Sequence, residues 1–190
     1  ALRRQILDLQ DAFTALEEAR FPVIAAIHGA CVGGGIDLVT AVDVRIASAD
    51  AYFAVEEINI GMAADVGTLQ RLPRIVPRGV ARELCYTGRR FSAEEALGFG
   101  FVNAVRVDRD DARDAAFAMA REIAARSPLA IAGIKRALAY AEDHTVADGL
   151  DQIATWNAGM LRPDDLMKSL KARAAKQAAL FEDLPAAKSV

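Results

Sequence analysis

Hydrophobic and polar positions alternate in two different ways along this chain. Residues 2–19 carry apolar side chains at the spacing of one helix face, and Pro22 ends that pattern. Residues 23–27 form a continuous apolar run of strand length, which is typical of a strand buried on both faces. Further strand patterns follow at residues 44–47, 52–55 and 102–107. The first half of the chain therefore alternates between helix and strand.

Capping and turn residues mark where further helices begin and end. The three glycines at residues 33–35 predict a tight turn into a helix at residues 36–42. Ser92 and Glu95 have the spacing of a capping box, and Ser127, which precedes a proline, is typical of a helix start. Other helices are predicted at residues 79–86 with Gly88 as the cap, at 112–126, at 129–141, and as two or three helices from 146 to about 181. Strand, glycine turn, helix and strand in this succession predict an α/β fold.

The balance between strands and helices changes along the chain. No strand pattern follows residue 107, and the composition shifts near Ser127. We therefore expect an α/β core at residues 1–126 and an all-helical region at residues 127–190. The chain begins at Ala1, without a methionine and with a helix already under way, which we interpret as part of a longer polypeptide.

The composition argues against several classes of partner and of site. The chain has 190 residues, of which 53% are hydrophobic, and this is enough for a sizeable core. A net charge of -3 without a concentrated basic patch argues against nucleic acid as a partner. No apolar run approaches the roughly 18 residues of a membrane helix, so membrane insertion is not expected. Cys31 and Cys85 are isolated, which predicts neither a disulfide framework nor a zinc site and fits a reducing compartment.

The glycine turn is the first candidate for chemistry. A strand followed by Gly33, Gly34 and Gly35 and then by a helix directs backbone N–H groups and a positive helix end toward one spot, which suits a developing anion. The same residues could instead form only a tight turn without a ligand. Their spacing does not match G-x-G-x-x-G or a Walker loop, so a nucleotide phosphate site is disfavoured.

Acidic positions follow the glycines within a largely apolar segment. Asp37 lies near the start of the predicted helix, where an acid is typical of a helix-dipole partner. Glu56 and Glu57 end a predicted strand, so one should face inward and the other outward. Asp65 precedes another predicted helix and could be its N-cap. If three of these carboxyl groups share an apolar pocket, their pKa values would separate, so that one donates and another accepts a proton next to a carbonyl.

Several longer motifs resemble those of a known family. The segment PVIAAIHG at residues 22–29 precedes the glycine turn, and GTLQRLP occupies residues 67–73. The segments LCYTG at residues 84–88 and AEEALGFGFV at residues 93–102 extend the match, which covers nearly the whole chain. Together with the glycine turn, these motifs resemble the enoyl-CoA hydratase/isomerase (crotonase) family.

The resemblance implies a fold, a substrate and an assembly. The fold would be the crotonase-like (ClpP/crotonase) spiral of β-β-α repeats, with an all-helical C-terminal region that helps to form homotrimers or homohexamers. The substrate would be an acyl-CoA thioester, with coenzyme A as part of the substrate and with no metal or redox cofactor. Gly34, next to Gly33, matches the position that supplies one backbone N–H of an oxyanion hole. The second donor normally comes from an upstream loop, which this sequence lacks.

The acids resemble those of one subgroup of the family. Asp37 and Glu57 occupy the positions of the two glutamates of hydratases, and Asp65 replaces a glycine that is typical of hydratases. The trio is similar to that of the Δ3,5-Δ2,4-dienoyl-CoA isomerases, which convert a 3,5-dienoyl-CoA to a 2,4-dienoyl-CoA in fatty-acid beta-oxidation. By this resemblance Glu57 would remove a proton at C2 and Asp65 would deliver one at C6, or the two would exchange roles. Asp37 would tune or orient the pair.

Two other functions remain open. An enoyl-CoA hydratase would use Asp37 and Glu57 to add water to a 2-enoyl-CoA, but it would have no evident use for Asp65. An inactive family member would bind acyl-CoA as a scaffold, which buried like charges disfavour. The Ala- and Arg-rich composition favours a bacterial cytoplasmic protein, whereas a eukaryotic source would place it in mitochondria or peroxisomes.

Overall fold

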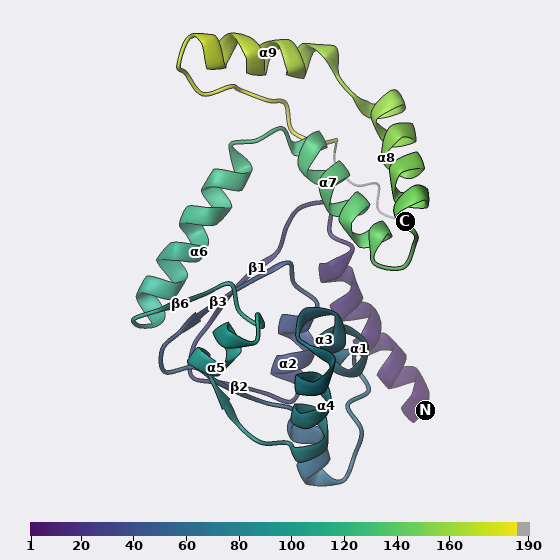
Figure 1. The fold of residues 1–190 in the computed structure, drawn as a ribbon, viewed down its shortest axis with the longest axis vertical. Helices are drawn as coiled ribbons and strands as arrows, with labels where there is room; N and C mark the ends of the chain where they lie inside the picture. Colours follow the sequence, from purple (N-terminus) through teal and green to yellow (C-terminus); the bar gives the residue numbers. More distant parts are fainter. Residues whose placement is uncertain (186–190) are drawn as a thin grey trace. The chain divides into compact units, whose positions relative to one another are not determined.

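The structure is a computed structural model that describes residues 1–185. It divides into two compact units, residues 1–118 and the residues from Met119 onward. The division falls within α6 (Arg109–Ala124), a little before the boundary that the sequence predicts at Ser127. All strands of the described chain lie in the first unit, and residues 107–185 contain none, as the sequence predicts (Figure 1).

Short strands build two three-stranded sheets in the first unit. The strands are β1 (Ile24–Ile27), β2 (Ala30–Val32), β3 (Val44–Ser48), β4 (Tyr52–Ala54), β5 (Phe91–Ser92) and β6 (Ala104–Arg106). One sheet has the order β1-β3-β6 and is parallel throughout, with Ile24 opposite Val44. The other has the order β2-β4-β5, in which β2 runs parallel and β5 antiparallel to β4.

The first four strands alternate between the two sheets, and each pair of them is followed by a helix. β1 and β2 lead into α2 (Gly34–Thr40), whereas β3 and β4 lead through a 3₁₀-helix, η1 (Glu56–Ile60), into α3 (Thr68–Ile75). The strand–strand–helix repeat predicted from the sequence is therefore confirmed. Because β2 and β4 are parallel neighbours, the segments that follow them begin at the same edge of the sheet. This pairing brings the start of α2 close to the start of η1.

Two details of the strands differ from the sequence-based expectation. β2 was not predicted, because three residues between Gly29 and Gly33 are too few to show an alternating pattern. The expectation that residues 23–27 are buried on both faces is wrong: Ile27 is buried, but Ala26 is exposed. The physical reason is that side chains of adjacent residues point to opposite faces of a strand, and the face that carries Ala26 is not fully covered.

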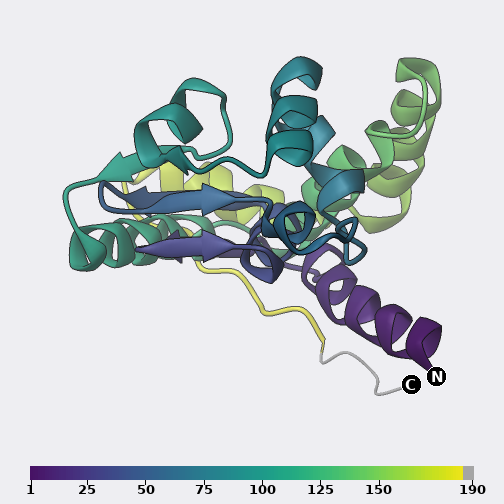
Figure 2. The ribbon, with the colours of Figure 1, turned by 90° about the horizontal axis from the view of Figure 1, so that it is seen from below.

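Local caps set the ends of several helices in the first unit. The remaining helices there are α1 (Leu2–Glu17), α4 (Arg78–Thr87) and α5 (Ala93–Gly98). Ser92 and Glu95 form the predicted capping box of α5. Gly88 caps α4 in the left-handed conformation, with φ of 59°, and a Cβ there would lie 2.6 Å from Ile58 Cγ2. α1 has no buried residue and extends away from the strands toward the N-terminus (Figure 2).

Aromatic side chains and one buried arginine hold the core of the first unit together. The ring centroids of Phe53 and Phe91 lie 5.2 Å apart, and Phe101 packs edge-on at 5.3 Å from Phe53. The buried Arg45 donates to the main-chain oxygens of Phe101 at 2.6 Å and Val42 at 2.8 Å. The bond to Val42, with another to the Val39 carbonyl at 3.2 Å, satisfies carbonyls at the end of α2, and burial lowers the pKa of Arg45. The position of α2 is thereby fixed from its C-terminal side.

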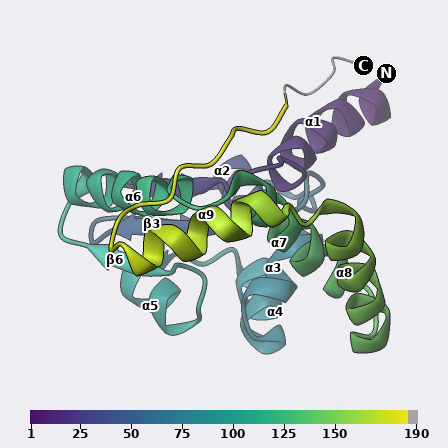
Figure 3. The same ribbon diagram turned by 90° about the horizontal axis from the view of Figure 1, so that it is seen from above.

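Helices make up most of the described part of the second unit. They are the end of α6, α7 (Pro128–Ala141), α8 (Val146–Met160) and α9 (Pro163–Ala174). Ser127 caps α7 as predicted. α7 and α8 run side by side (Figure 3), and Gly133 gives room for Trp156, whose Nε1 would lie 2.4 Å from a Cβ at that position. Among the helices of residues 1–185, none combines the length and the hydrophobicity that a membrane span requires. Residues 186–190 of the predicted helical region lie outside the described residues.

Candidate active site

The glycine turn has the backbone geometry that the sequence predicts. Gly33 has φ of 54° and ψ of -120°, a combination that favours glycine, and its N–H donates to the Ala54 carbonyl at 3.0 Å. Gly34 is the first residue of α2, so its N–H has no acceptor within the helix. Gly34 is exposed, and a Cβ on it would meet no atom within 4 Å. The Gly34 N–H is therefore accessible to an incoming oxygen.

Asp37 does more than complement a helix end. Its side chain is only 2% exposed, and its Oδ1 accepts two hydrogen bonds from Thr68, one from the backbone N–H and one from the hydroxyl, both at 2.7 Å. Thr68 is fully buried and begins α3, whose N-cap residue, Gly67, offers no side chain. Asp37 thus caps α3 from a different helix. This arrangement joins α2 to the segment that carries Asp65.

The predicted placement of Glu56 and Glu57 at a strand end is wrong. β4 ends at Ala54, and both glutamates lie on the 3₁₀-helix η1, so the alternation of a strand does not separate them. Both approach the glycine turn: a Cβ on Gly33 would lie 3.3 Å from Glu57 Oε1 and 3.7 Å from Glu56 Cβ. A 3₁₀-helix separates adjacent side chains by about 120° and not by the 180° of a strand, so both can lie toward the glycine turn.

Glu57 combines a buried carboxylate oxygen with a raised pKa. Its Oε2 is buried and has no hydrogen-bond partner within residues 1–185. Burial raises the pKa of Glu57 above its ordinary value, and the negative charges of Asp37, Glu56 and Asp65 raise it further, against a backbone hydrogen bond that lowers it. Burial raises the pKa of the Cys85 thiol on α4, and the negative charge of Glu57 raises it further. Glu57 is thus a carboxyl group that holds its proton more tightly than usual.

Asp65 lies in an irregular segment between η1 and α3. It is not the N-cap of α3, because that position belongs to Gly67. The side chain is partly exposed, and its charge contributes to the raised pKa of Glu57. Its main-chain oxygen accepts a hydrogen bond of 2.6 Å from Gln10 Nε2 on α1. The fold therefore brings Glu57 within electrostatic reach of both Asp37 and Asp65, as the sequence predicts.

Three contributors to this arrangement were not identified from the sequence. Thr68 and Arg71 lie within the quoted GTLQRLP motif, but nothing in its spacing reveals what their side chains contact. Gln10 lies 55 residues before its partner and gives no local signal. No group of three or more His, Cys, Asp or Glu side chains in the described chain is arranged to hold a metal ion, and Cys31 and Cys85 are free thiols.

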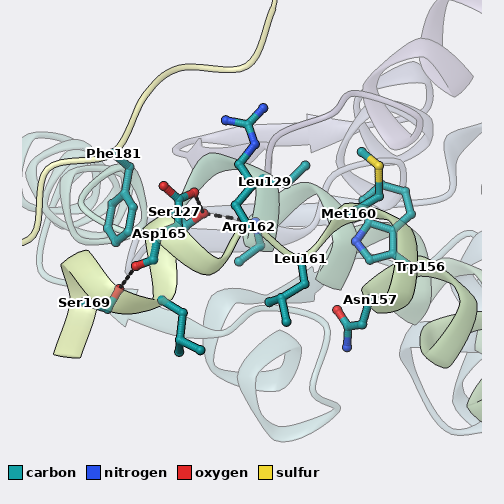
Figure 4. Close-up of a pocket in the computed structure, with 12 residues that line it drawn as sticks. Ser127, Leu129, Trp156, Asn157, Met160, Leu161, Arg162, Asp165, Ser169 and Phe181 are labelled. Atoms are coloured by element: carbon teal, nitrogen blue, oxygen red, sulfur yellow. Dashed lines mark hydrogen bonds between the residues drawn. The ribbon is translucent and has the colours of Figure 1, made fainter.

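A hollow in the second unit contains none of the three acids. Figure 4 shows Ser127 and Ser169 on either side of Asp165, with Ser127 donating to Asp165 Oδ2 at 3.4 Å and Ser169 donating to its main-chain oxygen at 2.9 Å. Trp156 and Phe181 line other parts of the wall. Its one acid, Asp165, already bonds to Ser127 and Ser169, so the hollow is a weaker candidate for proton chemistry.

Known proteins are similar to this chain in both sequence and fold. A sequence profile described as Enoyl-CoA hydratase/isomerase matches residues 4–184. The chain is 48% identical over 172 residues to the mitochondrial Delta(3,5)-Delta(2,4)-dienoyl-CoA isomerase of Pongo abelii, a match that covers 90% of this chain and 52% of that protein. It is 46% identical over 183 residues to the peroxisomal Delta(3,5)-Delta(2,4)-dienoyl-CoA isomerase of Arabidopsis thaliana, covering 96% of this chain and 66% of that protein.

The fold matches that of a solved relative. The crystal structure of an enoyl-CoA hydratase from Bacillus anthracis has a TM-score of 0.91 and 32% sequence identity, covering 96% of this chain and 70% of that one. The crotonase-like fold predicted from the sequence is confirmed. The chain spans about half to two thirds of the length of the two curated isomerases that it matches. This chain belongs to the enoyl-CoA hydratase/isomerase family.

Proposed function

We infer that this chain forms the acidic site of an isomerase that converts a 3,5-dienoyl-CoA to a 2,4-dienoyl-CoA. One observation carries the proposal: Glu57 has a buried carboxylate oxygen without a partner and a raised pKa, and Asp37 and Asp65 both act on it. Moving a conjugated diene requires one group to take a proton and another to return one, at carbons that lie several bonds apart. The 48% identity to a dienoyl-CoA isomerase supports the same reaction.

The proposed reaction is a proton shuttle. Glu57, ionised, removes a proton from C2, and the electron pair spreads into the dienolate, whose oxygen accepts a hydrogen bond from the Gly34 N–H. Asp65 delivers a proton at C6, so that the double bonds move to positions 2 and 4. The raised pKa of Glu57 makes its ionised form a stronger base than an ordinary glutamate, and it also reduces the fraction of Glu57 that is ionised, which would suit the exchanged roles. The exchanged roles, with Asp65 as the base, remain an alternative within the same proposal.

The role proposed for Asp37 is orientation. Its Oδ1 already accepts both donors of Thr68, so Asp37 is engaged with the protein. Its negative charge acts on Glu57 without a direct proton transfer. This engagement also weakens the hydratase alternative, in which Asp37 and Glu57 together would activate a water molecule.

Several further expectations belong to this proposal. Coenzyme A would enter only as part of the acyl-CoA substrate, and no separate cofactor is proposed. The second donor of the oxyanion hole, the assembly into trimers or hexamers, and the role in beta-oxidation stay predictions. The location stays a prediction as well: the two isomerases compared above are named mitochondrial and peroxisomal, whereas the composition favoured a bacterial cytoplasm.

The test is an isomerisation assay with the full-length protein. A 3,5-dienoyl-CoA is supplied, and the rise in ultraviolet absorbance of the 2,4-dienoyl thioester is followed for the wild type and for Asp65→Asn. We expect conversion by the wild type and a loss of at least about 100-fold in the variant, because a proton-transfer group contributes about 100- to 10,000-fold. No isomerisation, together with hydration of a 2-enoyl-CoA that survives Asp65→Asn, would establish the hydratase instead. Binding of acyl-CoA without any turnover would favour the inactive scaffold.

A further inference from the structure

The segment that carries Asp65 is not held by regular secondary structure. Residues 62–67 belong to no helix or strand, and the segment lies between two glycines with positive φ, Gly61 at 80° and Gly67 at 136°. Glycines in this conformation mark places where the chain direction is easily altered. Asp65 therefore lies on an irregular backbone segment, and contacts from other elements are needed to hold its side chain at one carbon of a substrate.

Side chains from three helices provide that support. Gln10 on α1 donates to the Asp65 carbonyl at 2.6 Å, and Arg71 on α3 donates through Nη1 to the Val66 carbonyl at 3.5 Å. Asp37 on α2 accepts the Thr68 N–H at 2.7 Å. Three of the four residues from Asp65 to Thr68 are thus fixed through their backbone groups.

Arg71 is itself fixed from α1. Its Nε and Nη2 donate to Glu17 Oε2 at 3.0 and 2.8 Å, and Nη2 also donates to Thr14 Oγ1 at 3.1 Å. The Arg71 side chain is 14% exposed and lies against Gly67, where a Cβ would come within 1.9 Å of Nη1. Gly67 therefore leaves the space that the guanidinium occupies.

The contacts on α1 come from a single face of that helix. Gln10, Thr14 and Glu17 follow one another at i, i+4 and i+7, the spacing that places side chains above one another on one side. α1 has no buried residue, so packing into the core does not explain this polar face. Side-chain groups of Gln10, Thr14 and Glu17 bond to Asp65 or to Arg71.

We propose that the polar face of α1, formed by Gln10, Thr14 and Glu17, together with Arg71, positions Asp65 for proton transfer at the distal carbon of the substrate. The inference rests on the isomerase function proposed above. Gln10 and Arg71 are positioning residues: they touch the backbone around Asp65 and not the substrate. A misplacement of about 1 Å in a reacting group can cost roughly 100-fold in rate, so hydrogen bonds to this backbone suffice to control the reaction.

The experiment compares Gln10→Ala with Gln5→Ala in the full-length protein. Gln5 is a glutamine on the same helix, but it is exposed and its side chain makes no hydrogen bond within residues 1–185. We expect Gln10→Ala to lower kcat for isomerisation about 10- to 100-fold with KM changed less than about threefold, and Gln5→Ala to leave both unchanged. Arg71→Lys, which keeps the charge but loses the forked donor set, should act in the same direction as Gln10→Ala.

A second readout separates positioning from a general loss of structure. In D₂O, Glu57 can exchange the C2 proton of the substrate without Asp65, whereas isomerisation needs both groups. Gln10→Ala should therefore keep its rate of deuterium exchange at C2 while it loses isomerisation. Equal losses in exchange and isomerisation, or no loss of isomerisation relative to Gln5→Ala, would overturn the inference. A wild-type protein that does not isomerise would overturn the proposed function itself, and with it this inference.

Discussion

At the scale of single residues, the candidate site depends on one carboxyl group that the protein leaves unsatisfied. Buried polar groups are nearly always hydrogen-bonded, and an unpaired buried oxygen such as Glu57 Oε2 destabilises the folded state. Neighbouring Asp37 shows the opposite arrangement, because Thr68 satisfies its Oδ1 twice. Two acids of similar chemistry therefore have different properties. Asp37 is engaged in hydrogen bonds within the protein, whereas Glu57 has an oxygen available to a substrate.

The pH dependence of stability should report the state of Glu57. Because its pKa in the folded protein lies above the ordinary value of 4.5, the folded state binds the proton more tightly than the unfolded state does. Its contribution to stability is full below that ordinary value and is lost as the pH rises through the raised pKa. Glu57→Gln cannot ionise, so we expect it to be more stable than the wild type at neutral pH, by about 1 kcal/mol at this partly solvated site.

Urea unfolding between pH 4 and 8 measures this difference. The free energy of unfolding of Glu57→Gln minus that of the wild type should increase across the window that starts near pH 4.5. Glu56→Gln is the matched control, since it removes a charge one residue away but no buried unpaired oxygen. A difference that stays constant with pH would show that Glu57 titrates normally.

At the scale of secondary-structure elements, the site is made by the ends of helices. The start of α2 presents the Gly34 N–H, η1 presents Glu57, and the segment before α3 presents Asp65. η1 is held in turn by α4, because Asn59 Nδ2 donates to the Gly88 carbonyl at 3.2 Å and Ile58 fills the space beside Gly88. The position of Glu57 therefore depends on a glycine at the far end of another helix.

Two glycines of α4 and its cap provide a matched test. Gly88→Ala places a Cβ at positive φ and 2.6 Å from Ile58, so we expect a loss of about 1–3 kcal/mol in stability and a lower isomerisation rate. Gly79→Ala adds the same methyl group within α4, where no atom lies within 4 Å, and should be neutral or stabilising by up to about 1 kcal/mol. Thermal unfolding and the dienoyl-CoA assay measure both effects. Equal behaviour of the two variants would contradict the role assigned to Gly88.

At the scale of the whole molecule, the second unit exposes many apolar side chains. On α7, Leu138 is 66% exposed and Ile134 is 54% exposed, and α8 exposes Leu150 at 64%. Large exposed apolar surfaces are typical of interaction sites. This exposure agrees with the expectation that the helical C-terminal region takes part in assembly.

The assembly can be tested by light scattering after size-exclusion chromatography. We expect the wild type to elute with the mass of three or six copies, and Leu138→Glu to shift that mass toward a single chain. Burial of one leucine contributes about 2 kcal/mol to an interface, and an unpaired buried charge costs more. Val107→Glu changes an apolar residue of the first unit that is 80% exposed, and it should keep the assembly intact. A wild type with the mass of one chain would contradict the expected assembly.

The sequence by itself determined the features that depend on neighbouring residues. The capping box of Ser92 and Glu95, the Gly88 cap of α4 and the start of α7 at Ser127 were all predicted correctly. Each is decided by hydrogen bonds or dihedral angles within a few residues. The glycine turn at Gly33 belongs to the same class. The motifs also sufficed to identify the family and the crotonase-like fold.

Only the tertiary structure decided what the acids contact. Asp37 meets Thr68 across 31 residues and Gln10 meets Asp65 across 55, and no local pattern encodes such pairs. The strand alternation predicted for Glu56 and Glu57 failed because β4 stops early and a 3₁₀ turn follows. Long-range contacts of this kind depend on how helices pack once the sheets have formed. Neighbouring residues fix a cap or a turn, whereas the packing of distant elements fixes which acid stays unpaired.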